Sequence, residues 1–347
     1  MDRILLAHGS GGHLSHELIR DLFLPQFPAP ALARLDDAAV VETVARAIPG
    51  AKPVTPAAGR LAFTTDSYVV KPLFFKGGDI GRLAVCGTVN DLAMVGATPL
   101  YLSAAFVLEE GLDLDTLRRV VASMKASADQ AGVEIVAGDT KVVEKGGADQ
   151  LFITTAGLGV VPDGIDISAS NARPGDVIIL SGAIGDHGLA VLSEREGLAF
   201  RSQLASDVAP LNQLVAAMLR ASPDIHVMRD PTRGGLATAL NEIALQSQVA
   251  LVIEENKIPI HEGVRAACEM LGYDPLHVAN EGKLVAMVAA HAAAEIVEAM
   301  HGDRHGQEAT IIGEVTAQPE GKVLLRTGIG GTRVVDMLAG ELLPRIC

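Results

Sequence analysis

The chain has 347 residues, and 28 Lys and Arg against 42 Asp and Glu give a net charge of −14. Proteins that coat nucleic acid need a basic surface and aromatic stacking platforms, and this acidic chain with 3% aromatic residues and no Trp has neither. The length predicts about two domains. No apolar run reaches the roughly 18 residues of a membrane span, and three cysteines are too few for a disulfide framework. We therefore expect a cytoplasmic enzyme.

The first half of the chain alternates loops, helices and β-prone runs. A glycine-rich loop, HGSGG at 8–12, is followed by a helix expected near 13–23. The short β-prone run LAFTT ends at Asp66, and Asp79 is a typical N-cap for a helix over 80–95. Four more elements are expected before residue 162: a strand over 100–109, a helix over 113–131, and strands over 133–137 and 151–161.

Turn-forming residues between 162 and 175 mark the expected boundary between two domains, over 1–162 and 163–335, with a mobile tail over 336–347. In the second half, strands are expected near 177–181, 249–254, 283–289, 309–315 and 322–326. Helices are expected near 187–196, 208–221, 234–247, 262–271 and 292–301. Strands and helices intermingle without a regular βαβ order, which predicts an α+β fold rather than a doubly wound parallel sheet.

Four aspartates of the first half lie in otherwise apolar or small-residue stretches: Asp37, Asp66, Asp91 and Asp139. A carboxylate is costly to bury unless a positive group meets it. Any one of them could be a hydrogen-bonded structural residue or a helix cap, but four in one half favour a metal cluster. Carboxylate oxygens suit Mg²⁺, which usually binds together with substrate phosphates.

The HGSGG loop is a candidate phosphate cover, because its glycines, Gly9, Gly11 and Gly12, with Ser10 between them, let backbone N–H groups approach phosphate oxygens. It is neither a Walker A motif nor a Rossmann fingerprint. A simple turn is the alternative.

Three charged residues each have two possible roles. Lys141 follows Asp139 by two residues and either holds phosphate or an oxyanion, or makes a surface ion pair. Arg233, in RDPTRGG, either forms an anion site at a helix start or belongs to an ordinary capped helix. Glu281, in NEGK, is a general base or a turn carboxylate, and the sequence alone favours the turn.

The three cysteines differ in their surroundings. Cys86 and Cys268 lie on apolar helical stretches and are expected in the core. Cys347 ends a tail, so we expect an exposed and mobile thiol, with Arg345 nearby to favour the thiolate modestly. An accidental terminal cysteine is the alternative.

Ten strings together resemble the PurM-like ATP-binding superfamily and, more closely, its HypE family of hydrogenase maturation factors: HGSGG, DDAAV, TTDSYVV, NDLAMVGATP, EEG, GDTKVV, GDHG, RDPTRGGLA, NEGK and the terminal PRIC. Several of these strings occur across the superfamily and specify only ATP handling. The terminal PRIC distinguishes the HypE family from selenophosphate synthetase, whose reactive residue lies near the N-terminus.

The resemblance implies a two-domain fold whose N-terminal domain dimerises through its sheet, with ATP and Mg²⁺ bound in a cleft. The implied partners are the carbamoyltransferase HypF, which carbamoylates Cys347, and the HypC–HypD complex, which receives the cyano group made by ATP-dependent dehydration. The implied catalytic residues are Cys347, Glu281 and Lys141, and the implied metal ligands are Asp37, Asp66, Asp91 and Asp139. The implied nucleotide site adds Gly9, Ser10, Gly11, Gly12, Thr140 and Arg233 to these aspartates. A kinase-like or selenophosphate-synthetase-like enzyme acting on a small molecule, and a silent scaffold, are the alternatives.

Overall fold

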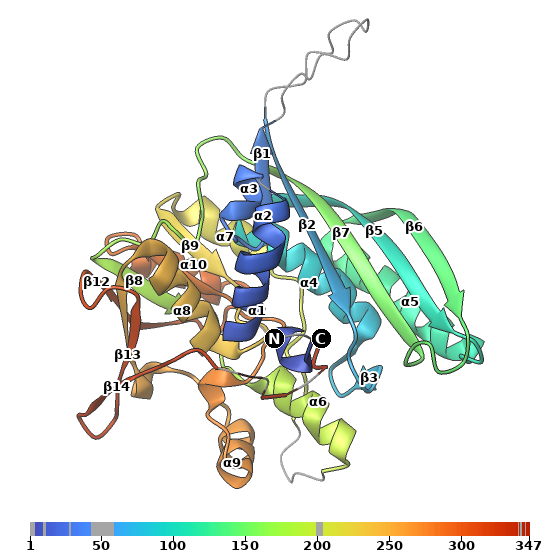
Figure 1. Ribbon diagram of the computed structural model, residues 1–347. Coiled ribbons are helices and arrows are strands. Elements are labelled where there is room, and N and C mark those ends of the chain that lie inside the picture. Colours follow the sequence, from blue (N-terminus) through green and yellow to red (C-terminus); the bar gives the residue numbers. More distant parts are fainter. Residues whose placement is uncertain are drawn as a thin grey trace, which may run out of the picture.

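Each half of the chain builds one sheet, and helices pack on it (Figure 1). The computed structural model describes residues 4–9, 12–27, 29–42, 59–198, 204–338, 340, 342–343 and 345–347. No helix in these ranges has the length and apolar character needed to cross a membrane. The mixture of strands and helices confirms the α+β class predicted from the sequence.

The first sheet has five strands, in the spatial order β1 (Ala39–Glu42), β2 (Arg60–Tyr68), β7 (Leu151–Val161), β5 (Thr98–Glu109) and β6 (Glu134–Val143). Neighbouring strands are antiparallel except β5 and β6, which are parallel. A two-stranded ribbon of β3 (Phe74–Phe75) and β4 (Gly78–Asp79) leads from this sheet into the first long helix. The strand predicted over 133–137 thus continues through the GDTK string to Val143.

Helix α4 (Ile80–Met94) packs on this sheet, and α5 (Leu114–Ala131) packs on α4. The predicted start of α4 is confirmed, because Asp79 Oδ1 accepts hydrogen bonds from the backbone N–H groups of Gly81 at 2.8 Å and Arg82 at 3.1 Å. Helix α5 ends at Gly132, whose φ of 73° is the left-handed conformation that closes many helices.

The opposite face of the first sheet carries exposed apolar side chains. Residues alternate between faces along a strand, so Leu102 and Ala104 are buried under the helices while their neighbours Tyr101 and Val107 point away and are 45% and 36% exposed. Val160 of β7 is also exposed. Sequence alternation therefore gives this sheet one packed face and one open apolar face.

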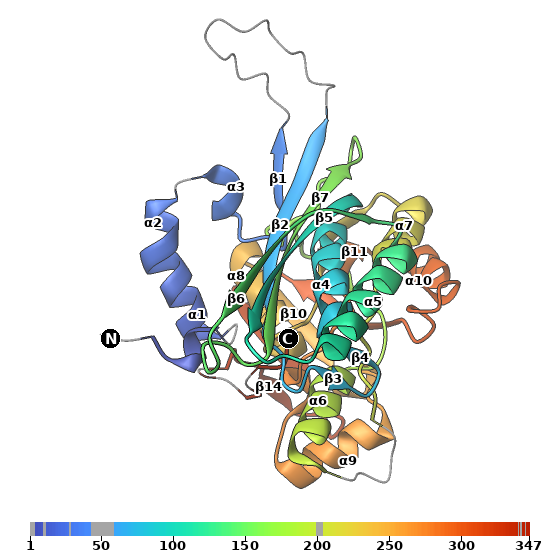
Figure 2. The ribbon, with the colours of Figure 1, turned by 90° about the vertical axis from the view of Figure 1, so that its right-hand side faces the viewer.

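The second sheet has seven strands, in the order β14 (Thr332–Val334), β13 (Lys322–Arg326), β10 (Ala250–Glu254), β12 (Thr310–Thr316), β8 (Asp176–Leu180), β11 (Val285–Ala289) and β9 (Ile225–Arg229). Its central strands are buried on both faces, as their nearly continuous apolar runs require. Figure 2 shows helices on either side of this sheet, with α8 (Gly235–Ser247) on one side and α7 (Asn212–Ala221) and α10 (Ala293–His301) on the other.

Shorter helices complete the fold. Helices α6 (Asp186–Glu196) and α9 (Glu262–Leu271) pack on each other. The helix expected near 13–23 is present but irregular, because α1 (His13–Leu18) continues through a π-helical turn (Ile19–Phe23) into α2 (Leu24–Gln26). A last short helix, α3 (Pro30–Ala33), precedes β1.

Helix α4 also joins the two halves. Its Asn90 donates a hydrogen bond to the Ala209 carbonyl at 3.1 Å and accepts one from the Leu211 N–H at 2.8 Å. Ala93 and Met94 at its end belong to the apolar core formed with α7 and α10. The chemistry-bearing motifs of both halves meet along this contact.

Candidate active site

Three of the four predicted aspartates meet a fourth that the sequence analysis did not single out. Asp37 lies just before β1, Asp66 in β2, and Asp91 in α4, while Asp230 follows β9. Thr64 holds Asp91 in place, since its hydroxyl donates to Asp91 Oδ2 at 2.8 Å. We call Asp37, Asp66, Asp91 and Asp230 the acidic cluster.

The carboxylates of the acidic cluster repel one another. Burial raises the pKa of Asp91 well above its usual value, and the charges of Asp230, Asp66 and Asp37 raise it further. Burial likewise raises the pKa of Asp230 to about 6, against the opposing effect of Arg229. Partly buried carboxylates that repel one another in this way would be stabilised by a bound cation.

Two arginines face the cluster. Arg229 lies 3.4 Å from Asp37 and 2.7 Å from Glu242, which also contacts His16 at 2.7 Å. Arg233 lowers the pKa of Asp66, which burial otherwise raises. A cavity of about 160 Å³ is lined by Asp37, Asp230 and both arginines. Carboxylates and arginines around one cavity are the groups that bind a metal and its phosphates.

The glycine-rich loop reaches this site at its first glycine, Gly9. The Arg233 guanidinium donates to the Gly9 carbonyl at 2.8 Å, although 224 residues separate the two in sequence. Gly12 lies at the start of α1. Ser10 and Gly11 lie outside the described residues. The phosphate-covering role of this loop stays a prediction.

Asp139 and Lys141 lie apart from the cluster within one chain. Across the sheet, Asp139 pairs with Ala105, Ala105 with Thr154, and Thr154 with Ser67, the neighbour of Asp66. Three strand spacings, or about 14 Å, therefore separate Asp139 from Ser67. These residues point to the open face of the sheet, whereas Asp66 points to the packed face. Lys141 Nζ contacts Asp139 at 2.8 Å in an exposed ion pair, as the surface alternative predicted, and the neighbouring Thr140 is exposed as well.

The acidic cluster fits Mg²⁺ only with added ligands. Among the described residues, no three His, Cys, Asp or Glu side chains are placed to hold one metal ion. Mg²⁺ in phosphate-transfer sites is usually held by one or two carboxylates, waters and substrate phosphates. The donor chemistry therefore suits an ion that arrives with a nucleotide, and the predicted four-aspartate shell is not preformed in a single chain.

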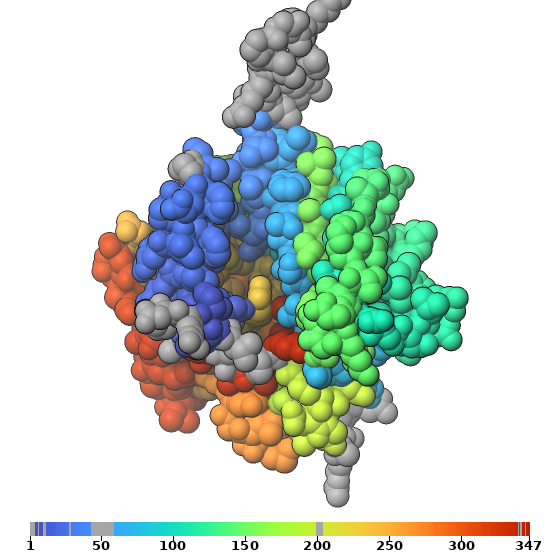
Figure 3. Space-filling model, turned by 45° about the vertical axis from the view of Figure 1, so that its right-hand side comes forward, coloured from blue at the N-terminus to red at the C-terminus, as the bar shows by residue number. Residues whose placement is uncertain are grey.

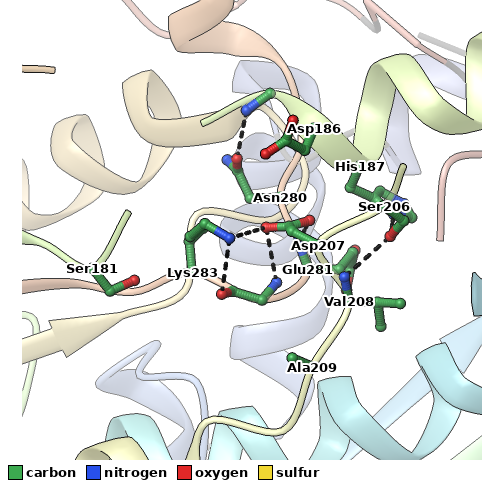
Figure 4. A network of polar contacts seen from close by, with 12 residues as sticks. Ser181, Asp186, His187, Ser206, Asp207, Val208, Ala209, Asn280, Glu281 and Lys283 are labelled. Atoms are coloured by element: carbon green, nitrogen blue, oxygen red, sulfur yellow. Dashed lines mark hydrogen bonds and ion pairs between the residues drawn. The ribbon is translucent and has the colours of Figure 1, made fainter. Parts of the chain in front are cut away.

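The NEGK turn is held by a residue that the sequence analysis missed. Asp207 accepts hydrogen bonds from the backbone N–H groups of Glu281 at 3.1 Å and Gly282 at 3.2 Å, and Lys283 Nζ lies 3.2 Å from its carboxylate. Figure 4 shows Asp207 between Lys283 and this turn, with Asn280 turned toward the start of α6. The Asn280 side chain accepts a hydrogen bond from Gly185 N–H at 2.7 Å.

Glu281 is poised to take up a proton. Its side chain is 3% exposed, and its Oε1 atom has no hydrogen-bond partner among the described residues. Burial raises its pKa well above the usual value, and the charges of Asp230, Asp207 and Asp66 add to the shift, against Arg233. The sequence favoured a turn carboxylate; Glu281 does occupy the turn, but its burial and free oxygen are typical of a general base.

The chain end docks inside the protein. We expected an exposed thiol at Cys347, and this was wrong, because the residue is half-buried. The Cys347 carbonyl accepts a hydrogen bond from Val69 N–H at 3.1 Å, and the Ile346 carbonyl accepts one from His187 Nε2 at 2.9 Å. Ile346 is buried in the core beneath the first sheet. Figure 3 shows the red chain end within a recess between the N-terminal helices and the green strands.

Cys347 shares a cavity with Arg233, one of the two arginines at the acidic cluster. This cavity of about 190 Å³ is lined by Gly9, Arg233, His277 and Cys347, among others. Burial raises the pKa of the Cys347 thiol, Arg233 lowers it, and Glu281 raises it. The docked thiol therefore lies within electrostatic reach of both side chains. Cys86 and Cys268 are buried in the core, as predicted.

The missed residues had weak signals in the sequence. Asp230 stands in the RDPTRGG string, but β9 before it was not predicted, so nothing marked Asp230 as a strand-end residue. Asp207 lies 74 residues from the turn it holds. His187, which the sequence analysis did not single out, anchors the tail backbone through Nε2, and its Nδ1 contacts the Ser206 hydroxyl at 2.8 Å.

Comparison with known proteins identifies the family of the chain. The family model described as "AIR synthase related protein, N-terminal domain" matches residues 35–161, and its C-terminal counterpart matches 173–326. Carbamoyl dehydratase HypE of Cupriavidus necator is 53% identical over 345 residues, which cover 99% of this chain and 95% of that protein.

Two solved structures are similar over nearly the whole length. A HypE in complex with ATP is 49% identical with a TM-score of 0.81, covering 99% of this chain and 100% of its own. A HypE–HypF complex matches at 47% identity and a TM-score of 0.85, covering 92% of this chain and 99% of that chain. Identity at this level, on the same two-sheet fold, shows that the chain belongs to the HypE family of carbamoyl dehydratases, enzymes of hydrogenase maturation.

Proposed function

We propose that this enzyme uses ATP to remove water from a carbamoyl group carried on Cys347, leaving a thiocyanate that supplies the cyanide ligand of the NiFe-hydrogenase iron. The observation that carries the proposal is the docked thiol, which shares one cavity with Arg233 and lies within the electrostatic reach of Glu281. A kinase-like or selenophosphate-synthetase-like enzyme acting on a small molecule would have no use for a thiol held there.

The reaction removes one oxygen and two N–H protons from the carbamoyl group. ATP supplies the phosphoryl group that turns the amide oxygen into a leaving group, so the products are thiocyanate, ADP and phosphate. Glu281 accepts one N–H proton through its unpartnered Oε1, because its raised pKa makes the protonated form accessible, and the second N–H proton leaves with the released phosphate. Arg233 holds negative charge beside the sulfur and the phosphoryl oxygens.

We propose that the acidic cluster is the Mg²⁺-binding site. Asp37, Asp66, Asp91 and Asp230 would together offer one or two carboxylate ligands, and the bound ion would neutralise negative charge so that nucleotide phosphates can approach. The Gly9 loop and Arg233 lie next to the cluster and would hold the phosphates.

We also propose a homodimer formed through the open face of the first sheet. Exposed Tyr101, Val107 and Val160 give that face an apolar surface. Asp139 and Lys141 point to the same face, so any contribution from them to an active site would come from the partner subunit. This places the proposed polarising role of Lys141 in the assembly rather than in one chain.

The tail has to serve more than one site. We propose that it leaves its dock to be carbamoylated by HypF, returns for dehydration, and then delivers the cyano group to the HypC–HypD complex. The dock combines backbone hydrogen bonds with the apolar packing of Ile346, and all of these contacts are non-covalent, so they can break and re-form without chemistry.

Intact-mass measurement tests the proposal. Incubation with HypF, carbamoyl phosphate and ATP should add about 43 Da for the carbamoyl group and then leave a net gain of about 25 Da. Cys347→Ala should abolish both shifts. A gain of about 25 Da on Cys86 or Cys268 in peptide mapping, or in the Cys347→Ala variant, would refute the proposal in favour of the small-molecule alternative.

A further inference from the structure

Arg345 holds the docked tail in place but takes no part in the proposed chemistry. Arg345 Nε donates to the Val69 carbonyl at 2.9 Å, and the Arg345 carbonyl accepts from Lys71 N–H at 3.3 Å. With the Val69–Cys347 hydrogen bond, these contacts pair the chain end antiparallel to residues 69–71. Backbone pairing of this kind fixes the register of the tail but would accept almost any side chain.

The side chain of Arg345 has its own partner. Arg345 Nη1 donates to Asp149 Oδ2 at 2.6 Å, and Lys71 Nζ lies 3.0 Å from the same oxygen. The hydrogen bonds from Arg345 and Lys71 lower the pKa of Asp149, so the carboxylate is charged at neutral pH. Both members of the Arg345–Asp149 pair are about 30% exposed, at 29% and 31%. The pair is thus accessible enough to open reversibly.

The loop that carries Asp149 is itself organised. Glu109, at the end of β5, accepts hydrogen bonds from the backbone N–H groups of Gly146 at 2.6 Å and Gln150 at 2.8 Å. Both carboxylate oxygens of Glu109 are therefore used to shape the connection between β6 and β7. Glu109 is the first residue of the EEG string, so this string has a structural role: it fixes the loop that places Asp149 next to the tail.

We propose that Asp149 is a positioning residue that recognises Arg345 and sets the fraction of tails that are docked. It acts on the reaction only through the tail, since its carboxylate contacts Arg345 and Lys71 and not Cys347. The inference rests on the proposed function for its biological meaning, because a tail that serves several sites needs a dock of limited strength. The dock itself can be measured without any chemistry.

The test measures how fast a thiol reagent labels Cys347 in the unmodified protein. A docked thiol is shielded, so labelling reports the released fraction. Asp149→Asn should raise the Cys347 labelling rate about three- to fivefold, the usual size of a partly exposed ion pair. The control variant Asp115→Asn removes a more exposed ion pair, with Arg118 on α5, that does not touch the tail, and it should label at the wild-type rate. Cys86 and Cys268 report folding, because they stay unlabelled while the core is intact.

The charge-swapped variant Asp149→Arg with Arg345→Asp separates pairing from loop structure. Each single substitution should raise the Cys347 labelling rate, and the double variant should label more slowly than either single variant, because it restores the ion pair but not the Val69 and Lys71 contacts. Wild-type labelling in Asp149→Asn would overturn the proposal, as would a folded double variant that labels as fast as its parents. The proposed function fails separately, if carbamoylated wild-type protein does not lose water when ATP is added.

Discussion

The carboxylate of Asp207 and the ammonium of Lys283 lie 3.2 Å apart in the protein interior and hold the turn that carries Glu281. The Asp207 side chain is 4% exposed and the Lys283 side chain is 13% exposed. A buried pair of this kind is costly to break, because the remaining charge is left without a partner. Asp207 and Lys283 therefore position Glu281, although neither is proposed to touch the substrate.

Asp207→Asn should lower the free energy of unfolding by about 3 kcal/mol, because it leaves Lys283 charged and unpaired in the interior. It should also slow water loss from the carbamoylated tail, since the Glu281 backbone loses part of its anchor. Removing the negative charge of Asp207 should lower the pKa of Glu281, so the acid limb of the pH–rate profile should move to lower pH. Chemical denaturation and single-turnover mass measurement check these effects.

The double variant Asp207→Asn with Lys283→Met is the matched control for stability. It removes both charges, so it should recover most of the lost free energy of unfolding without restoring the pH–rate profile. Recovery of the wild-type profile in this variant would contradict the electrostatic role given to Asp207.

Glu281→Gln should leave carbamoylation of Cys347 intact and block dehydration, because an amide cannot accept the N–H proton. It should also stabilise the protein at neutral pH. Glu281 has a folded pKa above its unfolded value, so the wild type loses stability as pH rises from about 4.3, where the unfolded carboxyl ionises, toward the folded pKa. The gain from Gln should thus be small near pH 4 and grow with pH. A pH-independent gain would contradict the burial of an ionising Glu281.

Asp91→Asn should reduce ATP turnover by at least about tenfold while the protein remains folded, because it removes a carboxylate oxygen from the proposed Mg²⁺ seat. The variant should also weaken ATP binding in the presence of Mg²⁺ more than in its absence, as calorimetry can measure. An equal loss of ATP affinity with and without Mg²⁺, or turnover at the wild-type rate, would remove Asp91 from the site.

Tyr101→Glu should convert the proposed dimer into a monomer, since it places a charge on the open apolar face. Light scattering at micromolar concentration measures the mass. Leu114→Glu is the control: Leu114 is 63% exposed, but it lies on α5, on the packed side of the sheet. A wild-type protein that scatters as a monomer would count against the dimer and against a role for Lys141 in a partner's site.

Local signals in the sequence predicted the parts of the fold that local interactions determine. The helices α4 and α5 have their N-caps at the expected Asp79 and Asp113, and β7 spans the expected residues. Strand β9 was missed because its five residues, IHVMR, mix polar and apolar side chains and become a strand only beside β11. Asp230 could not be placed in the site without it.

The residues that depend on distant contacts were harder to predict. Glu281 was ambiguous because its turn is held by Asp207, which is remote in sequence. The tail was expected to be exposed because no local pattern shows that Val69, His187 and Asp149 would receive it. Asp139 and Lys141 were grouped with the cluster by residue type, but strand alternation sends them to the other face of the sheet.

The most direct measurement follows the carbamoyl oxygen. Carbamoyl phosphate labelled with oxygen-18 in its carbonyl group is used to carbamoylate Cys347, the modified protein is isolated, and ATP is added for a single turnover. Dehydration driven by phosphoryl transfer predicts that the label appears in inorganic phosphate as the thiocyanate forms on Cys347. Label found in water, or thiocyanate formed without ATP, would contradict the account.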